Sequence, residues 1–150
     1  VLILDMLKSI MPVIILNLLN LFETQGTIQF FALLFVVGHC YPIYNKFKGG
    51  KGVATGIGPL VIIFFPSSIA ALIVFIIAIL FTKYVSLGSI LGCIFAFISM
   101  VVFNLFNLFD SSYYDLIYII PAVSMIIYKH KENILRLIDN NENKLSFKKI

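Results

Sequence analysis

Charged residues are scarce in this 150-residue chain. They make up 12% of it, while 61% of the residues are hydrophobic; ordinary soluble domains carry about 25% charged residues. A domain of this size cannot hide so much apolar surface in one core and still cover itself with polar groups. The composition therefore excludes a water-soluble globular protein and indicates a chain embedded in a lipid bilayer.

The chain also lacks the residue patterns of several common sites. Its two cysteines, Cys40 and Cys93, lie far apart without metal-ligand spacing, which argues against a disulfide framework and a zinc site. Neither histidine is followed five residues later by Asp, the arrangement of one large acyltransferase class, because Tyr44 and Leu135 occupy those positions. No G-x-S-x-G elbow is present. We expect no metal or cofactor, and we expect catalysis to depend on positioning an activated substrate.

Charge-free stretches of membrane length separate the few charged residues. We expect six apolar helices, because an open strand would leave its backbone groups unpaired in hydrocarbon. Their predicted ranges are Leu7–Phe22, Thr27–Tyr41, Val53–Phe65, Ser67–Phe81, Leu87–Phe109 and Leu116–Tyr128. The stretch from Val53 to Phe81 is too long for one ordinary crossing of about 20 residues, and Pro66 divides it into two short halves.

The distribution of basic residues decides between five and six crossings. With six crossings and residue 1 in the cytoplasm, all eleven basic residues lie on the cytoplasmic side, and the opposite loops carry Glu23, Asp110 and Asp115. With five crossings, four lysines would lie outside. Cytoplasmic loops of membrane proteins carry the excess of Lys and Arg. The sequence therefore predicts an all-α polytopic membrane protein with six transmembrane helices.

Three glycines and three lysines lie within residues 46–52, immediately before the third predicted helix. Glycine backbones and a helix N-terminus can direct N–H groups at a phosphate. The pattern is not a Walker loop, because Gly52 follows Lys51 where Ser or Thr is required. The alternative is a basic loop that only sets topology or touches anionic lipid headgroups.

Two further polar clusters are predicted at the same membrane face. Ser86 and Ser89 lie at the start of the fifth predicted helix, where Ser86 alone could be a helix N-cap. His130 and Asn133 are three residues apart, so on a helix they share one face and could bind one ligand. Residues 130–150 are predicted to form a cytoplasmic amphipathic tail. Together with the glycine loop, these clusters predict a phosphate-binding surface.

The clusters resemble the motifs of a known family. Gly38-His39, Pro42 and the run Phe47–Thr55 resemble the central motif of the PlsY family, bacterial membrane glycerol-3-phosphate acyltransferases that use acyl-phosphate as donor. The C-terminal motif of that family is similar to the run His130–Ile134 followed by Arg136-Leu137, Glu142 and Lys144. The segment Leu4–Lys8 resembles the Leu-Asp-Lys segment that follows the family's N-terminal motif.

The resemblance implies a single integral membrane acyltransferase domain over residues 1–150, with a seven-helix fold whose first helix and N-terminal motif precede residue 1. It implies transfer of an acyl chain from acyl-phosphate to the 1-hydroxyl of sn-glycerol 3-phosphate, which gives lysophosphatidate and phosphate in phospholipid biosynthesis. The expected place is the bacterial inner membrane, with the site and the C-terminus facing the cytoplasm. A functional link to a soluble phosphate acyltransferase that makes acyl-phosphate is also implied. Binding to nucleic acid is not implied.

By the same resemblance, the site residues fall into two groups. The expected catalytic residues are His130, Asn133, Ser86 and Ser89. The residues expected to bind substrate phosphate are Gly38, His39, Lys48, Gly49, Gly50, Lys51 and Gly52.

A transporter or channel for an organic phosphate is the other function that the residues allow, since short helices and a glycine-rich turn also build ion paths. Against it, almost every polar residue lies on one predicted face, and little is left near the membrane midplane to bind a solute.

Overall fold

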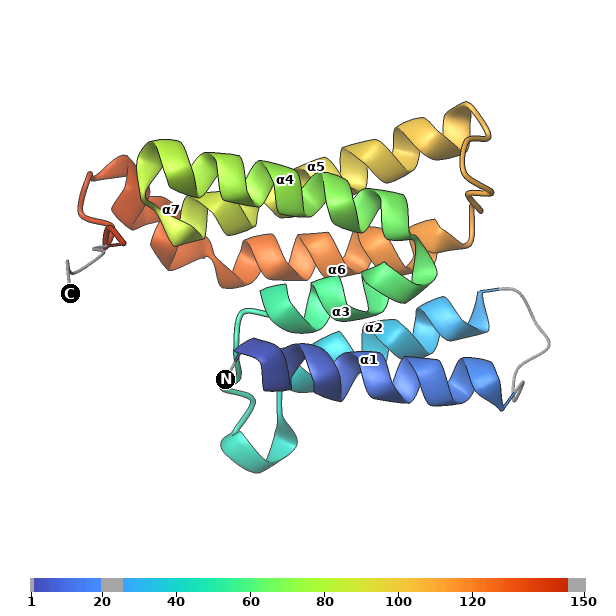
Figure 1. The fold of residues 1–150 in the computed structure, drawn as a ribbon. Helices are drawn as coiled ribbons and strands as arrows, with labels where there is room; N and C mark the ends of the chain where they lie inside the picture. The colour runs from blue at the N-terminus through green and yellow to red at the C-terminus, as the bar shows by residue number, and fades with distance from the viewer. Residues whose placement is uncertain (1, 20–25, 146–150) are drawn as a thin grey trace.

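The protein is a bundle of helices (Figure 1). The structure, a computed structural model, describes residues 2–19 and 26–145, and these contain helices and no strand. The helices are α1 (Leu2–Leu18), α2 (Thr27–Cys40), the 3-10 helix η1 (Ile43–Asn45), α3 (Val53–Ile63), α4 (Phe65–Thr82), α5 (Val85–Leu105), α6 (Asp115–Lys129) and α7 (Lys131–Ile138). The all-α prediction is confirmed. The predicted positions of Glu23, Lys148 and Lys149 lie outside the described residues.

The long predicted segment around Pro66 is divided into two helices, as expected. α3 ends at Ile63 and α4 begins at Phe65, with Phe64 alone between them. Pro66 therefore lies in the first turn of α4, where its missing N–H costs no helical hydrogen bond. α3 has only 11 residues, so it is about half the length of an ordinary membrane crossing.

α4 and α5 form a closely packed hairpin, because two glycines on α5 face the backbone of α4. A Cβ at Gly92 would lie 3.0 Å from the Ala71 carbonyl oxygen, and one at Gly88 would lie 3.0 Å from that of Phe75. Small residues let membrane helices approach closely where no hydrophobic force drives them together.

Apolar side chains cover the outside of the bundle as well as its core. Met100, Val13 and Val36 are fully buried, whereas Leu80 on α4 is 70% exposed and Leu105 on α5 is 67% exposed. An apolar exterior of this kind suits contact with lipid. Within residues 2–19 and 26–145, three segments are long and apolar enough to span a membrane, namely Thr27–Asn45, Phe65–Thr82 and Val85–Leu105.

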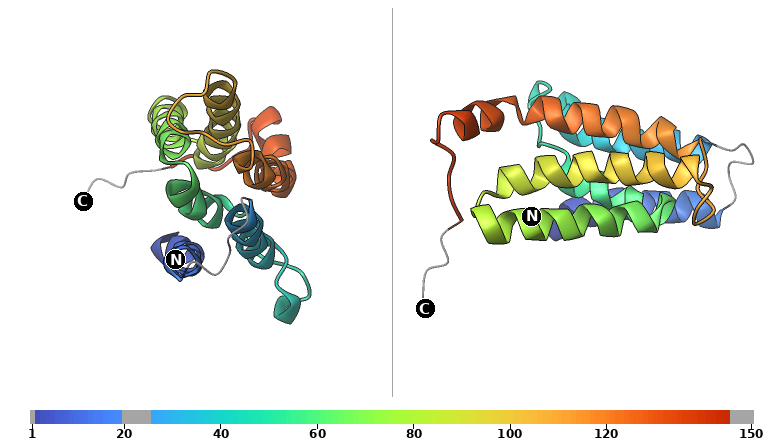
Figure 2. Two further views of the ribbon diagram at one scale, coloured as in Figure 1. Left: turned by 90° about the vertical axis from the view of Figure 1, so that its right-hand side faces the viewer. Right: turned by 90° about the horizontal axis from the view of Figure 1, so that it is seen from above.

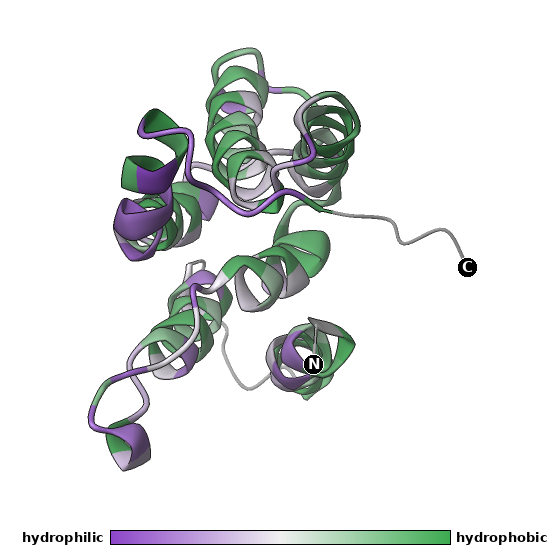
Figure 3. Cartoon of the chain, turned by 90° about the vertical axis from the view of Figure 1, so that its left-hand side faces the viewer, coloured by the Kyte–Doolittle hydropathy of each residue, from purple (hydrophilic) through white to green (hydrophobic). Residues whose placement is uncertain are grey.

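The two ends of the bundle differ in charge. At the end that carries α7 and η1, here called the basic end, lie the described basic residues Lys8, Lys46, Lys48, Lys51, Lys83, Lys129, Lys131, Arg136 and Lys144. Figure 3 looks onto this end and shows hydrophilic ribbon in α7 and in the segment that follows it. Asp110 and Asp115 lie at the opposite end, where α5 connects to α6. The fold therefore gathers the cations at one end, as the sequence predicts.

Candidate functional site

A polar cavity of about 420 Å³ lies at the basic end. Its lining residues are Lys51, Val53, Val85, Ser86, Ser89, His130, Asn133, Glu142, Asn143, Lys144 and Leu145. They come from the beginnings of three helices and from the segment after α7. The polar cavity thus joins the three clusters that the sequence places at one membrane face.

Three helix N-termini border the polar cavity. Val53 is the first residue of α3, Val85 is the first residue of α5, and His130 is the N-cap of α7. None of these three helices has a hydrogen bond from a capping side chain. The first N–H groups of a helix lack partners within it, and this end carries the positive side of the helix dipole. The arrangement favours an anion in the cavity.

A hydrogen-bond chain crosses the wall of the cavity. Lys51 Nζ donates to Asn133 Oδ1 over 2.6 Å, although the two residues are 82 positions apart. Asn133 Nδ2 donates to Glu142 Oε1 over 2.9 Å, and Arg136 Nε donates to Glu142 Oε2 over 2.9 Å. These bonds fix the Asn133 amide and leave two protons of the Lys51 ammonium group for a ligand.

Glu142 stays ionised inside this wall. Burial raises the pKa of its carboxyl, but the hydrogen bonds from Asn133 and Arg136 outweigh burial and hold the pKa below its usual value. The Ser86 hydroxyl is also close enough to lower the pKa, without forming a hydrogen bond of normal geometry. Because Arg136 neutralises Glu142, Lys51 and Lys144 leave the cavity positively charged.

His130 is held neutral with a defined tautomer. Only 2% of it is exposed, and its Nδ1 lies 2.8 Å from the Ile126 carbonyl oxygen. A carbonyl can only accept, so Nδ1 carries the proton and Nε2 has a free lone pair. Burial lowers the pKa of the imidazole, and the neighbouring Lys51 charge lowers it further, against the opposing effects of Ile126 and Glu142. The ring is therefore neutral at physiological pH.

The two serines differ in what their hydroxyls do. Ser89 Oγ donates to the Val85 carbonyl oxygen over 3.0 Å. Ser86 Oγ is buried and has no hydrogen-bond partner among the described residues. It lies in the first turn of α5, whose N-cap is Tyr84, so the interpretation of Ser86 as the N-cap is wrong. A buried hydroxyl without a partner is costly, and a ligand in the cavity would supply one.

The glycines before α3 pack against the end of α2. Gly50 N donates to the His39 carbonyl oxygen over 3.1 Å, and a Cβ at Gly50 would overlap the His39 ring. A Cβ at Gly49 would overlap the same carbonyl group. Only Gly52, the N-cap of α3, has a positive φ, of 84°. Close approach therefore explains the first two glycines, and left-handed backbone explains the third.

Of the residues predicted to bind phosphate, only Lys51 lines the polar cavity. Gly49, Gly50 and Gly52 shape the loop that presents it. Lys48 is exposed in that loop, and Gly38 lies on α2 with no atom close to its Cβ position. All four residues predicted to be catalytic line the cavity.

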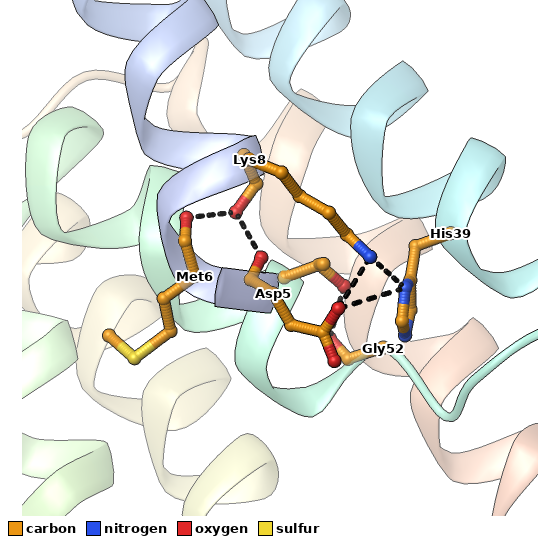
Figure 4. Close-up of polar contacts among 7 residues, drawn as sticks. Asp5, Met6, Lys8, His39 and Gly52 are labelled. Atoms are coloured by element: carbon orange, nitrogen blue, oxygen red, sulfur yellow. Dashed lines mark hydrogen bonds and ion pairs between the residues drawn. The ribbon is translucent and has the colours of Figure 1, made fainter. Parts of the chain in front are cut away.

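A second polar cluster supports the glycine loop from behind (Figure 4). Lys8 Nζ lies 2.5 Å from Asp5 Oδ1 and donates to His39 Nδ1 over 2.8 Å. The neutral His39 ring therefore carries its proton on Nε2, beside Gly50. The sequence prediction did not assign Asp5 and Lys8 to the site, although an ion pair in an otherwise apolar helix is the signal that could have found them.

An apolar groove of about 360 Å³ lies among α3, α4, α5 and α6. Val53 and Ser89 line both this groove and the polar cavity. The two spaces therefore adjoin, so that a ligand with a charged head and an apolar chain could occupy both. Across residues 2–19 and 26–145 no group of three His, Cys, Asp or Glu side chains could hold a metal ion.

Several known proteins are similar to this chain in sequence. A family described as glycerol-3-phosphate acyltransferase matches residues 1–140. A glycerol-3-phosphate acyltransferase of Finegoldia magna is 45% identical over 113 residues, which are 75% of this chain and 54% of that protein. Proteins of the same name from Legionella pneumophila strain Corby and Anaplasma phagocytophilum are 38% and 40% identical, over 99% and 97% of this chain and 50% and 72% of theirs. The chain spans about half the length of the first two relatives.

Two crystal structures share the fold. They show PlsY, an integral membrane glycerol 3-phosphate acyltransferase, in a glycerol 3-phosphate form and in a lysophosphatidic acid form. Each has a TM-score of 0.84 and 32% sequence identity, and the match covers 97% of this chain and 69% or 70% of the other.

Proposed function

Because the chain belongs to the glycerol-3-phosphate acyltransferase family, we propose that it transfers an acyl chain from acyl-phosphate to the 1-hydroxyl of sn-glycerol 3-phosphate. The products are lysophosphatidate and inorganic phosphate, and the reaction serves phospholipid biosynthesis. The observation that carries the proposal is the adjoining pair of spaces, a cationic cavity and an apolar groove that share Val53 and Ser89. The related PlsY structures with glycerol 3-phosphate and with lysophosphatidic acid support the substrate and the product.

The polar cavity binds the phosphate of glycerol 3-phosphate. Lys51 supplies the positive charge. One N–H of its ammonium group donates to Asn133, and the other two remain available to hydrogen-bond the phosphate. The first turns of α3 and α5 add N–H groups, and the Ser86 hydroxyl gains its missing partner. The acyl chain lies in the apolar groove, so that the acyl carbonyl carbon comes to the junction near Ser89.

In the reaction, the 1-hydroxyl oxygen attacks the acyl carbonyl carbon and forms the new ester bond. The bond between that carbon and the donor phosphate oxygen breaks, and inorganic phosphate leaves. His130 accepts a hydrogen bond from the hydroxyl at Nε2, the nitrogen without a proton, and Asn133 keeps Lys51 in place. The hydroxyl proton ends on the departing phosphate. Positioning supplies most of the rate, because the acyl-phosphate is already activated.

The membrane arrangement follows from the charges. We propose six crossings by α1 to α6, with the basic end and the C-terminal tail in the cytoplasm of a bacterial cell, at the inner membrane. The cavity then faces the compartment that holds glycerol 3-phosphate, and a soluble phosphate acyltransferase supplies the acyl-phosphate.

The test is lysophosphatidate formation from acyl-phosphate and glycerol 3-phosphate by the protein in lipid bilayers. We expect product with the unaltered protein and a large loss of kcat in His130→Ala, with the protein still folded. Absence of product from the unaltered protein, or full activity of His130→Ala, would contradict the proposal. Uptake of labelled glycerol 3-phosphate into proteoliposomes without an acyl donor would instead indicate a transporter.

A further inference from the structure

A short loop projects sideways from the basic end. This loop, residues 41–50, is here called the finger, and it carries η1. The left view of Figure 2 looks along the helices and shows the finger beyond α2, outside the other helices. In Figure 1, the finger lies at the end of the bundle where α1 and α3 begin. The finger therefore extends sideways from the basic end and away from the bundle.

The finger is held in shape by its own backbone. Phe47 N donates to the Pro42 carbonyl oxygen over 3.0 Å, and Lys48 N donates to that of Asn45 over 2.9 Å. The Asn45 amide also donates back to the Lys48 carbonyl oxygen. At the base, Lys129 Nζ donates to the Cys40 carbonyl oxygen and lies 3.9 Å from the centre of the Tyr41 ring. These hydrogen bonds give the finger a defined conformation, unlike an extended connecting segment.

The tip of the finger presents apolar side chains to its surroundings. Tyr44 is 93% exposed, Ile43 is 82% exposed and Phe47 is 59% exposed. Exposing three such side chains to water contributes nothing to folding, because the hydrophobic effect stabilises apolar surface only when it leaves water. Aromatic rings with a polar edge, such as tyrosine, are typical of the membrane interface.

The charge of the finger is of one sign. Lys46 and Lys48 are exposed beside the apolar tip. The sequence has no Asp or Glu between Glu23 and Asp110, so no acidic residue of α2, the finger, α3 or α4 balances them. A basic and apolar surface complements the anionic lipid interface, where phosphates and acyl chains meet.

We propose that the finger is an interfacial anchor that binds anionic lipid headgroups. Ile43, Tyr44 and Phe47 enter the boundary between headgroups and acyl chains, and Lys46 and Lys48 contact lipid phosphates. The finger ends in Gly49 and Gly50, directly before Lys51, so its anchoring also fixes the stretch of chain that presents Lys51. The proposal does not depend on the acyl-transfer chemistry.

The chain contains no tryptophan, so one introduced indole reports on the finger alone. We place the protein with Tyr44→Trp in lipid nanodiscs of phosphatidylcholine and phosphatidylglycerol, with one of the two lipids brominated near its headgroup. We expect blue-shifted emission and stronger quenching by brominated phosphatidylglycerol than by brominated phosphatidylcholine. In the Lys46→Gln, Lys48→Gln background the two lipids should quench equally. Phe47→Trp provides a second reporter if the first variant folds poorly.

Two controls fix the scale. Asn141→Trp, in the exposed segment after α7, should give unquenched emission typical of water. Ile77→Trp, on the exposed face of α4, should be quenched without preference for either lipid. The proposal is overturned if the Tyr44→Trp emission matches that of Asn141→Trp, which would leave the tip open to a soluble partner. It is also overturned if the preference for phosphatidylglycerol persists without both lysines.

Discussion

Both ends of the bundle bury polar side chains, but the two ends differ in whether these side chains have hydrogen-bond partners. At the opposite end, Asp115 is 4% exposed and both its oxygens have partners. Its Oδ1 accepts from Gln29 Nε2 over 2.8 Å, and its Oδ2 accepts from Ser112 N over 3.1 Å. At the basic end, Ser86 is 7% exposed, and its hydroxyl has no hydrogen-bond partner in the described part of the chain. The first arrangement stabilises the fold, and the second leaves a group for a ligand.

A missing partner alone does not make a site. Asn104, in the last turn of α5, also has a buried oxygen without a hydrogen bond among the described residues, although its Nδ2 donates to the Met100 carbonyl oxygen. No lysine or arginine occurs between Lys83 and Lys129 in the sequence, and Asn104 does not line the polar cavity. Ser86 differs because a cavity, a cation and three helix N-termini surround it.

Among the variants that test this difference between the two ends, removal of the Lys51 charge should have the largest effect. We expect Lys51→Ala to raise the KM for glycerol 3-phosphate roughly 10- to 150-fold, because one charge-assisted hydrogen bond contributes about 1.5–3 kcal/mol. The measurement is acyl transfer at varied glycerol 3-phosphate. Lys131→Ala is the matched control, since it removes the same charge at the same end from a residue outside the cavity. Equal KM values in the two variants would contradict the assignment.

At the opposite end, the expected effect is on stability alone. Asp115→Asn replaces the carboxylate that accepts from Gln29 and Ser112 by a neutral amide, and hydrogen bonds to a charged group are stronger than neutral ones by about 0.5–1.5 kcal/mol. We expect a lower thermal unfolding temperature in detergent and an unchanged KM. Asp110→Asn, at an exposed position with φ of 52° that Asn tolerates, should leave both unchanged. A raised KM in Asp115→Asn would remove the distinction between the ends.

The sequence was sufficient to predict which end of the bundle gathers the basic residues and the residues that line the polar cavity. The charge-free stretches predicted the helices, and Pro66 marked the break between α3 and α4 to within two residues. Ser86, His130 and Asn133 were predicted to lie together, and they line one cavity with Lys51. These predictions succeed because charged residues lie at the ends of apolar helices, so their positions in the sequence show which residues lie at the same end of the bundle.

Lateral contacts could not be predicted. Nothing in the sequence shows that Lys51 meets Asn133, or that Glu142 folds back onto Asn133 and Arg136. The packing of the glycines could not be predicted for the same reason. Gly49 and Gly50 are small because the end of α2 lies against them, and a helix that is distant in sequence leaves no local signal.

The smallest expected difference separates the two serines. Ser86→Ala should raise the KM for glycerol 3-phosphate roughly 2- to 12-fold, because a hydrogen bond formed only with the ligand contributes about 0.5–1.5 kcal/mol. Ser89→Ala should change it less than twofold, roughly 0.4 kcal/mol or less, since the Ser89 hydroxyl already donates to Val85. Ser86→Ala also removes a buried hydroxyl without a partner, so the protein should unfold at an equal or higher temperature. A larger KM effect from Ser89→Ala would mean that the missing partner of Ser86 does not mark the ligand.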